Sequence, residues 1–155
     1  MEVAEAALVI DLEDQPVYWH LPAGRTPTVI PDSRDLWLVL WANRERLAGV
    51  AHTHPAGILT PSRTDLRTFA ACEDGLGRRL VWWIVTPAEV VVCSFRDGAP
   101  DGYICRPDSD RHTWVDELRR CSWPPATDDL SNRRDVTDNR AGRHGPTDTR
   151  EEDNP

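Results

Sequence analysis

The sequence contains no lysine, so all 18 of its basic residues are arginines. It also has no apolar run that approaches the roughly 18 to 20 residues of a membrane-spanning helix, which argues against an α-helical membrane protein. The first five residues, Met1 to Glu5, include two acids and no base, unlike a secretory signal peptide. A formal net charge of -8 argues against nucleic acid as the main partner.

The four cysteines lack the paired Cys-x-x-Cys spacing of zinc knuckles and redox motifs. Their positions are Cys72, Cys93, Cys105 and Cys121. This arrangement is typical of a reduced protein that uses cysteine as a small buried side chain, rather than of a disulfide framework. We therefore expect four unpaired cysteines and a cytoplasmic location.

Apolar residues are scarce at the C-terminal end, where residues 124–155 contain one leucine, one valine and no aromatic residue. Such a segment cannot bury enough apolar surface to offset the entropy lost on ordering. We expect one folded domain over residues 1–123, followed by a disordered tail over residues 124–155. His144, which lies in this tail, is then a solvated residue.

Short apolar and β-branched runs predict about six strands, mainly antiparallel. The run at residues 80–85 is continuously apolar, which is typical of a strand covered on both faces. The run at residues 47–51 leads directly into a pair of histidines. The other strands are expected at residues 5–12, 17–20, 88–95 and 102–105.

Two longer helices are predicted between these strands. The first begins at the capping residues 31–33 and runs to Leu47, with Trp37 and Trp41 covering the core. The second runs from Ser62 to the glycines at 75 and 77. Residues 114–120 also fit a short helix, because apolar side chains recur there on one side.

The most informative stretch is residues 52–65, where the strand after residue 47 ends and the second long helix begins. On a strand, residues i and i+2 point to the same face, so His52 and His54 project side by side with Thr53 opposite. Asp65 follows at the start of the helix. Two histidines and one carboxylate are the protein ligands of one type of catalytic zinc site, which leaves a fourth position open.

Simpler interpretations account for parts of this pattern. Ser62-x-x-Asp65 alone is typical of a helix capping box with Asp in place of Glu. A barrel-type metal hydrolase needs at least ~200 residues, more than this chain has. A zinc deaminase needs His-x-Glu and Pro-Cys-x-x-Cys, and both are absent. His20 and His112 have no motif spacing to the stretch and are expected to be ordinary surface or half-buried residues.

The same stretch resembles the sequence signature of the JAMM (JAB1/MPN/Mov34) zinc metallopeptidases, His-x-His-Pro, six residues, then Ser-x-x-Asp. The resemblance covers roughly residues 5–105 and implies an α/β (α+β) fold. In this fold a curved, mainly antiparallel sheet of the MPN/cytidine-deaminase-like type is sandwiched by helices. It also implies that His52, His54 and Asp65 bind one Zn²⁺ per chain, and that Ser62 supports catalysis by hydrogen bonding to the oxyanion or the attacking water.

In this family a separate upstream glutamate moves the proton from water to the leaving nitrogen. Glu5, just before the first strand and several tens of residues upstream of His52, is the candidate. Glu2 and Glu13 remain alternatives. Glu45 is disfavoured because it lies between two arginines. If none of these glutamates reaches the metal, the domain would bind zinc and a partner without cleaving anything.

The resemblance implies a metallopeptidase that cleaves an isopeptide or peptide bond at the C-terminus of a ubiquitin-like protein. E1-like and E2-like enzymes of the same pathway are then natural partners. A catalytically inactive binding or scaffold module and a metal hydrolase of another amide are the alternatives. Residues 24–30 and 56–61 are the candidate substrate loops. The absence of lysine either protects such an enzyme from conjugation or reflects genomic base composition.

Overall fold

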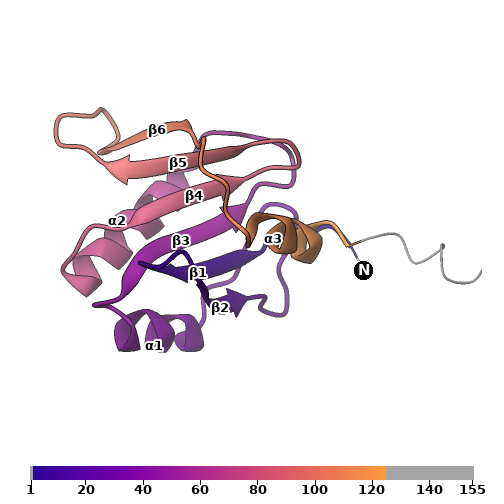
Figure 1. The fold of residues 1–155 in the computed structure, drawn as a ribbon, viewed down its shortest axis with the longest axis horizontal. Helices are drawn as coiled ribbons and strands as arrows, with labels where there is room; N and C mark the ends of the chain where they lie inside the picture. Colours follow the sequence, from indigo (N-terminus) through magenta and orange to yellow (C-terminus); the bar gives the residue numbers. More distant parts are fainter. Residues whose placement is uncertain (1, 125–155) are drawn as a thin grey trace, which may run out of the picture. The chain divides into compact units, whose positions relative to one another are not determined.

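The computed structural model describes residues 2–124. The predicted disordered tail, apart from Pro124, and His144 lie outside the described residues. Figure 1 shows that the described part is one mixed sheet with helices packed on both faces. Within it, no helix is long and apolar enough to cross a membrane.

The sheet has six strands in the order β2-β1-β3-β4-β5-β6. Neighbouring strands are antiparallel except β3 and β4, which are parallel because helix α2 connects them as a crossover. The α+β fold with a mainly antiparallel sheet is therefore confirmed. The strands are β1 (Ala7–Asp11), β2 (Pro16–His20), β3 (Leu47–Thr53), β4 (Val81–Val85), β5 (Val90–Phe95) and β6 (Tyr103–Pro107).

Alternation along the strands divides the apolar side chains between two cores. One core lies under helices α1 (Arg34–Ala42) and α2 (Arg63–Leu76) and includes Val50 and Trp82. The other lies under α3 (Val115–Ser122) and includes Ala51 and Trp83. Consecutive residues of β3 and of β4 thus enter opposite cores, which confirms the prediction that β4 is covered on both faces.

The first helix is shorter than predicted, since it ends at Ala42 and Leu47 already pairs with β1. Trp37 packs against the core as expected, but Trp41 is 52% exposed, so its predicted core position was wrong. A four-residue spacing places two side chains on the same side of a helix. It does not reveal how far the sheet beneath that helix extends. The predicted short third helix is present as α3.

The cysteine prediction was wrong for two of the four residues, because Cys93 and Cys105 form a disulfide. They lie directly opposite each other on β5 and β6, a pairing that the sheet register creates and that no local motif announces. Cys72 and Cys121 are unpaired as expected. Disulfides are more typical of oxidising compartments, and the cytoplasmic location stays a prediction.

A buried carboxylate links α2 to the sheet. Glu73 is 2% exposed and accepts hydrogen bonds from four groups. Two of the donors are themselves buried: the backbone N–H of Leu80 at 3.1 Å and the indole Nε1–H of Trp82 at 2.9 Å. The other two are the Arg79 guanidinium at 2.7 Å and the Tyr103 hydroxyl at 3.0 Å. This network fixes α2, and with it Asp65, against β4.

Candidate metal centre

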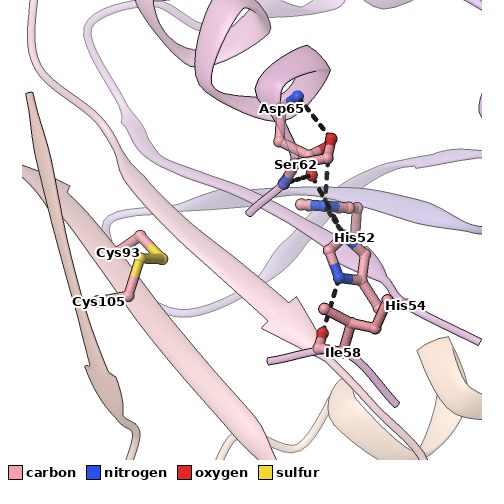
Figure 2. Close-up of a disulfide and its surroundings, with 7 residues drawn as sticks. All are labelled: His52, His54, Ile58, Ser62, Asp65, Cys93 and Cys105. Carbon is pink, nitrogen blue, oxygen red and sulfur yellow. Dashed lines mark hydrogen bonds and ion pairs between the residues drawn. A yellow bond between two sulfur atoms is a disulfide. The ribbon is translucent and has the colours of Figure 1, made fainter. Parts of the chain in front are cut away.

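The histidine pair projects from the end of β3 as the alternation predicts. The Nε2 atoms of His52 and His54 lie 3.0 Å apart (Figure 2). Thr53 points to the opposite face, where its Oγ1 accepts a hydrogen bond from Ala6 N at 2.9 Å and contacts Ser122 Oγ at 2.8 Å. These contacts lock the strand end, so that neither histidine can exchange faces with the threonine.

Asp65 reaches the histidines from the first turn of α2. Its Oδ1 lies 3.3 Å from His52 Nε2, and its Oδ2 lies 3.3 Å from His54 Nε2. Ser62 caps the helix: its Oγ accepts from Asp65 N at 3.1 Å, and the Asp65 carboxylate accepts from Ser62 N at 2.6 Å. Asp65 thus belongs both to the capping box and to the carboxylate–histidine cluster. Capping fixes the position of Asp65 beside the histidines.

Local hydrogen bonds set the charge and orientation of these groups. His54 Nδ1 lies 2.8 Å from the Ile58 carbonyl oxygen, so its N–H donates there and Nε2 faces the cluster. Burial alone would lower the pKa of His54, but hydrogen bonds to Asp65 and Ile58 raise it overall. Burial would raise the pKa of Asp65, but hydrogen bonds from both histidines and Ser62 hold it far below its usual range. These hydrogen bonds therefore favour the charged form of Asp65.

The spacing of the three side chains fits zinc. Zn–N and Zn–O distances near 2.0–2.1 Å with tetrahedral angles imply about 3.3 Å between neighbouring ligand atoms. The two Nε2 atoms lie 3.0 Å apart, close to this value. Each of them lies 3.3 Å from a different oxygen of Asp65, His52 from Oδ1 and His54 from Oδ2, and one ligand atom of each residue lies within 4.8 Å of the others. Two imidazole nitrogens and one carboxylate oxygen also form a donor set that zinc accepts readily, with one coordination position left over. His52, His54 and Asp65 can therefore hold a metal ion.

The register of the sheet brings Glu5 to this cluster. Ala7 pairs with His52 in the antiparallel β1–β3 ladder, and Thr53 N donates to Ala6 O at 2.9 Å. Continuing this register by two residues places Glu5 opposite His54, on the same face of the sheet. Glu5 lines the cleft that contains both histidines and Asp65. By contrast, Glu2 and Glu13 are exposed and are not among the described residues lining it.

The environment of Glu5 suits proton transfer near neutral pH. Burial raises the pKa of its carboxyl group to about 7, with His54 opposing the shift and Asp65 adding to it. Ser62 lines the same cleft and is exposed, with its Oγ acting as an acceptor towards Asp65 N. Glu5 and Ser62 thus both line the cleft that contains the three candidate metal-binding residues. Their catalytic roles stay predictions.

The cleft around the cluster has a volume of about 700 Å³. Both predicted substrate loops contribute to it, through residues 27–30 on one side and residues 56, 58, 60 and 61 on the other. Its floor is formed by the sheet and its walls by α1 and α2. A volume of this size is within the range of ligand sites.

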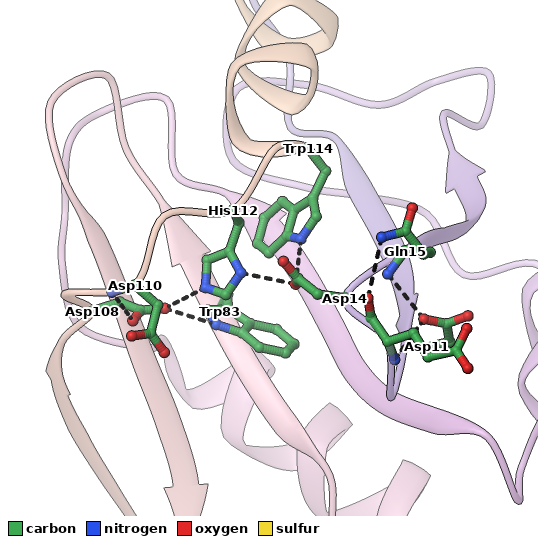
Figure 3. Close-up of polar contacts among 9 residues, drawn as sticks. Asp11, Asp14, Gln15, Trp83, Asp108, Asp110, His112 and Trp114 are labelled. Atoms are coloured by element: carbon green, nitrogen blue, oxygen red, sulfur yellow. Dashed lines mark hydrogen bonds and ion pairs between the residues drawn. The ribbon is translucent and has the colours of Figure 1, made fainter.

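A second group, Asp108, Asp110 and His112, also has atoms close enough to hold a metal. The signal in the sequence was the alternating Asp-x-Asp-x-His pattern, which the sequence analysis missed. Both ring nitrogens of His112 already contact carboxylates, Nδ1 with Asp14 at 2.8 Å and Nε2 with Asp108 at 2.9 Å (Figure 3). The same two carboxylates accept the indole N–H groups of Trp114 and Trp83. These contacts make the group a cross-link between the start of α3 and the sheet.

The remaining histidine also has a structural contact. His20 is only 1% exposed, so the expected surface or half-buried position was wrong. Its Nε2 lies 2.9 Å from the Pro31 carbonyl oxygen, which ties the end of β2 to the loop before α1. His112 is half-buried, as expected.

A mixed sheet between helices, with a His-x-His strand end facing an aspartate on the next helix, defines a domain of the JAB type, also called MPN or JAMM. The family model described as prokaryotic homologs of the JAB domain matches residues 3–97, more than half of the chain. The chain therefore belongs to this family. A comparison with curated proteins finds no match.

Proposed function

We propose that this protein is a zinc-dependent metallopeptidase that cleaves an isopeptide or peptide bond at the C-terminus of a ubiquitin-like protein. The observation that carries the enzymatic part is the position of Glu5 opposite His54, in the cleft that holds the three candidate ligands. Burial also raises the pKa of the Glu5 carboxyl group to about 7, which suits a group that accepts and returns a proton.

Each residue has a distinct role in this proposal. His52, His54 and Asp65 would hold Zn²⁺, which when bound would supply Lewis-acid chemistry for attack of water on the substrate carbonyl. Glu5 takes the proton of the attacking water and delivers it to the amide nitrogen, which must be protonated to leave. The Ser62 hydroxyl donates a hydrogen bond to the oxygen that develops negative charge.

The substrate part of the proposal rests on family membership and on the cleft between the two loops. An exposed C-terminal tail is a segment thin enough to enter such a cleft while its folded domain stays outside. E1-like and E2-like enzymes that attach the same tail are the expected partners. A cytoplasmic location fits this setting.

Metal analysis and a cleavage assay on a ubiquitin-like fusion test the proposal together. We expect one zinc per wild-type chain and its loss in His52→Ala, because two remaining ligands hold the ion weakly. Glu5→Gln should keep the zinc and lose cleavage by at least about 100-fold, the usual size of a general acid–base contribution. Glu13→Gln is the matched control, since Glu13 is exposed at a turn away from the cleft.

Three results would count against the proposal. Wild-type protein prepared without chelator and containing no zinc would remove the metal centre. An active Glu5→Gln enzyme would remove the assigned role of Glu5. Zinc-loaded protein that binds a ubiquitin-like fusion without cleaving it would identify a binding module instead.

A further inference from the structure

The segment that carries Glu5 extends beyond the end of the neighbouring strand β3. Thr53, the last residue of β3, donates its N–H to Ala6 O at 2.9 Å. The next amide of the chain, His54 N, donates to β4 instead, so the pairing with β3 stops at Ala6. Ala4 is nevertheless only 7% exposed, so its backbone N–H and C=O need other partners.

The end of α3 supplies these partners through Ser122, which is fully buried. Ala4 N donates to the Ser122 carbonyl oxygen at 3.2 Å, and the Ser122 hydroxyl donates to Ala4 O at 2.5 Å. Because that hydroxyl hydrogen is used, Thr53 Oγ1–H is the donor in its 2.8 Å contact with Ser122 Oγ. Thr53 Oγ1 in turn accepts from Ala6 N at 2.9 Å. One chain of hydrogen bonds thus joins the two alanines on either side of Glu5.

The opposite edge of the segment is held by the loop that precedes α1. Glu5 N donates to Thr26 O at 2.9 Å, and Arg25 Nη1 donates to Glu5 O at 3.1 Å. The same Arg25 nitrogen donates to Cys121 O at 3.0 Å, next to Ser122. Both edges of the Glu5 segment are therefore fixed, and the last turn of α3 contributes to both.

We propose that Ser122 is a positioning residue that holds Glu5 beside the candidate metal-binding residues. Ser122 is not among the described residues that line the cleft, so it acts through Ala4 and Thr53 rather than on the substrate. The proposal rests on the proposed function, because the position of Glu5 matters to the reaction only if Glu5 carries the proton. The family model matches residues 3–97, and α3 adds this contact from outside the matched part.

The position of Glu5 matters because proton transfer tolerates little displacement. A group that takes a proton must lie within about 2.6–3.2 Å of its partner atom. A misplacement of about 1 Å can lower the rate by about 100-fold. Glu5 has only one residue on each side between it and the anchoring contacts, so loosening of Ala4 moves its carboxyl group directly.

Ser122→Ala tests the proposal in the zinc-loaded full chain, with cleavage of the ubiquitin-like fusion as the assay. The substitution leaves Ala4 O without its donor and Thr53 Oγ1–H without its acceptor. We expect kcat to fall by at least about tenfold. KM and the zinc content should stay the same, because Ser122 lies outside the cleft.

Val115→Ala is the matched control at the other end of α3. Val115 is 9% exposed and packs in the core under this helix, so its truncation destabilises α3 without touching the Glu5 segment. We expect Val115→Ala to keep the wild-type kcat at temperatures where the domain stays folded. A role of Ser122 in stability alone would instead lower kcat in both variants.

Amide hydrogen exchange, followed by NMR in the same samples, reports on the segment without any substrate. The Glu5 amide is compared with that of Ile84, a fully buried residue of β4. We expect Ser122→Ala to raise the ratio of the Glu5 rate to the Ile84 rate by about tenfold, the factor that corresponds to the loss of one hydrogen bond. Val115→Ala should leave this ratio unchanged, because it acts on the fold as a whole.

Two substitutions at Thr53 test the same chain of hydrogen bonds from its other end. Thr53→Val keeps the branched shape without the hydroxyl, and it should lower kcat as Ser122→Ala does. Thr53→Ser keeps the hydroxyl and should restore most of the activity that Thr53→Val loses. The double variant Thr53→Val with Ser122→Ala should be no slower than the slower single variant, because both substitutions break one chain.

The proposal is overturned if Ser122→Ala raises the exchange ratio no more than Val115→Ala does, or if both variants lose kcat equally. It is also overturned if the ratio rises in Ser122→Ala while kcat stays at the wild-type value, and the peptidase itself then stands. If zinc-loaded wild-type protein cleaves nothing, the proposed function fails. A raised ratio confined to Ser122→Ala would in that case still support the hold of α3 on Glu5.

Discussion

Replacement of Glu73 by alanine should destabilise the domain strongly, although Glu73 touches neither the candidate metal-binding residues nor Glu5. The substitution leaves two buried donors without an acceptor, Leu80 N–H and Trp82 Nε1–H. Each unpaired buried donor costs about 1–3 kcal/mol. The side chain of Arg79 is 55% exposed and can turn to water, so its lost ion pair adds little. We expect a loss of about 4 kcal/mol in the free energy of unfolding.

Two further variants test whether the loss of stability comes from the unpaired buried donors. Glu73→Gln keeps one acceptor oxygen for the two buried donors and places its amide N–H₂ near Arg79 and Tyr103. Its expected cost is about 1–2 kcal/mol, less than half that of alanine. Asp74→Ala, an exposed neighbour on the same helix, should stay within about 0.5 kcal/mol of wild type.

Urea unfolding followed by far-UV circular dichroism measures all three variants. Both α2 and the cleft floor depend on Glu73, so we also expect Glu73→Ala to lower the affinity for zinc. The reasoning is wrong if Glu73→Ala loses less than about 1 kcal/mol, since even one unsatisfied buried donor costs that much. It is also wrong if glutamine and alanine are equally destabilising.

Three other predictions concern the sheet and its cross-links. Gly49→Ala should lower the free energy of unfolding, measured in urea, by at least about 3 kcal/mol and weaken zinc binding. The reason is that the new Cβ would lie 1.6 Å from the Val81 carbonyl oxygen and push β3 away from β4. A variant with wild-type stability and zinc binding would contradict this. Cys105→Ser should lower the free energy of unfolding by up to about 3 kcal/mol, the chain-entropy value for a disulfide that closes a loop of this length. Adding reductant to the wild-type protein should lower it by the same amount. Unchanged stability in reductant would refute the pairing. Although burial lowers the pKa of His112, hydrogen bonds to its two aspartate partners raise it above 6.5 overall. The wild type should therefore be more stable than His112→Gln, and this difference in the free energy of unfolding should be fully present below pH 6.5. It should decline as the pH rises through the higher pKa of the folded state. A difference that grows with pH would refute the prediction.

Local sequence patterns predicted the elements well because short-range physics determines them. The capping box at Ser62 and Asp65 and the left-handed Gly77 set the two ends of α2 almost where the sequence placed them. The end of α1 is capped by Asn43, whose backbone N–H and side-chain amide both donate to the Val39 carbonyl oxygen, a signal that the sequence-based prediction passed over. Residues 43–46 form a turn, and Leu47 leaves the helical pattern to pair with Asp11. Together with this cap, long-range strand pairing therefore decided that boundary.

The sequence by itself identified the three candidate metal-binding residues as a set. The two-residue period of a strand places His52 and His54 on one face, and the helix cap holds Asp65 near the chain that leaves this strand. Only the tertiary structure decided which glutamate joins them. Glu5 lies opposite His54 because β1 pairs with β3 in one register, and a shift by one residue would turn Glu5 to the other face. The Cys93–Cys105 disulfide arises in the same way, since it joins two strands whose register depends on how the whole sheet pairs.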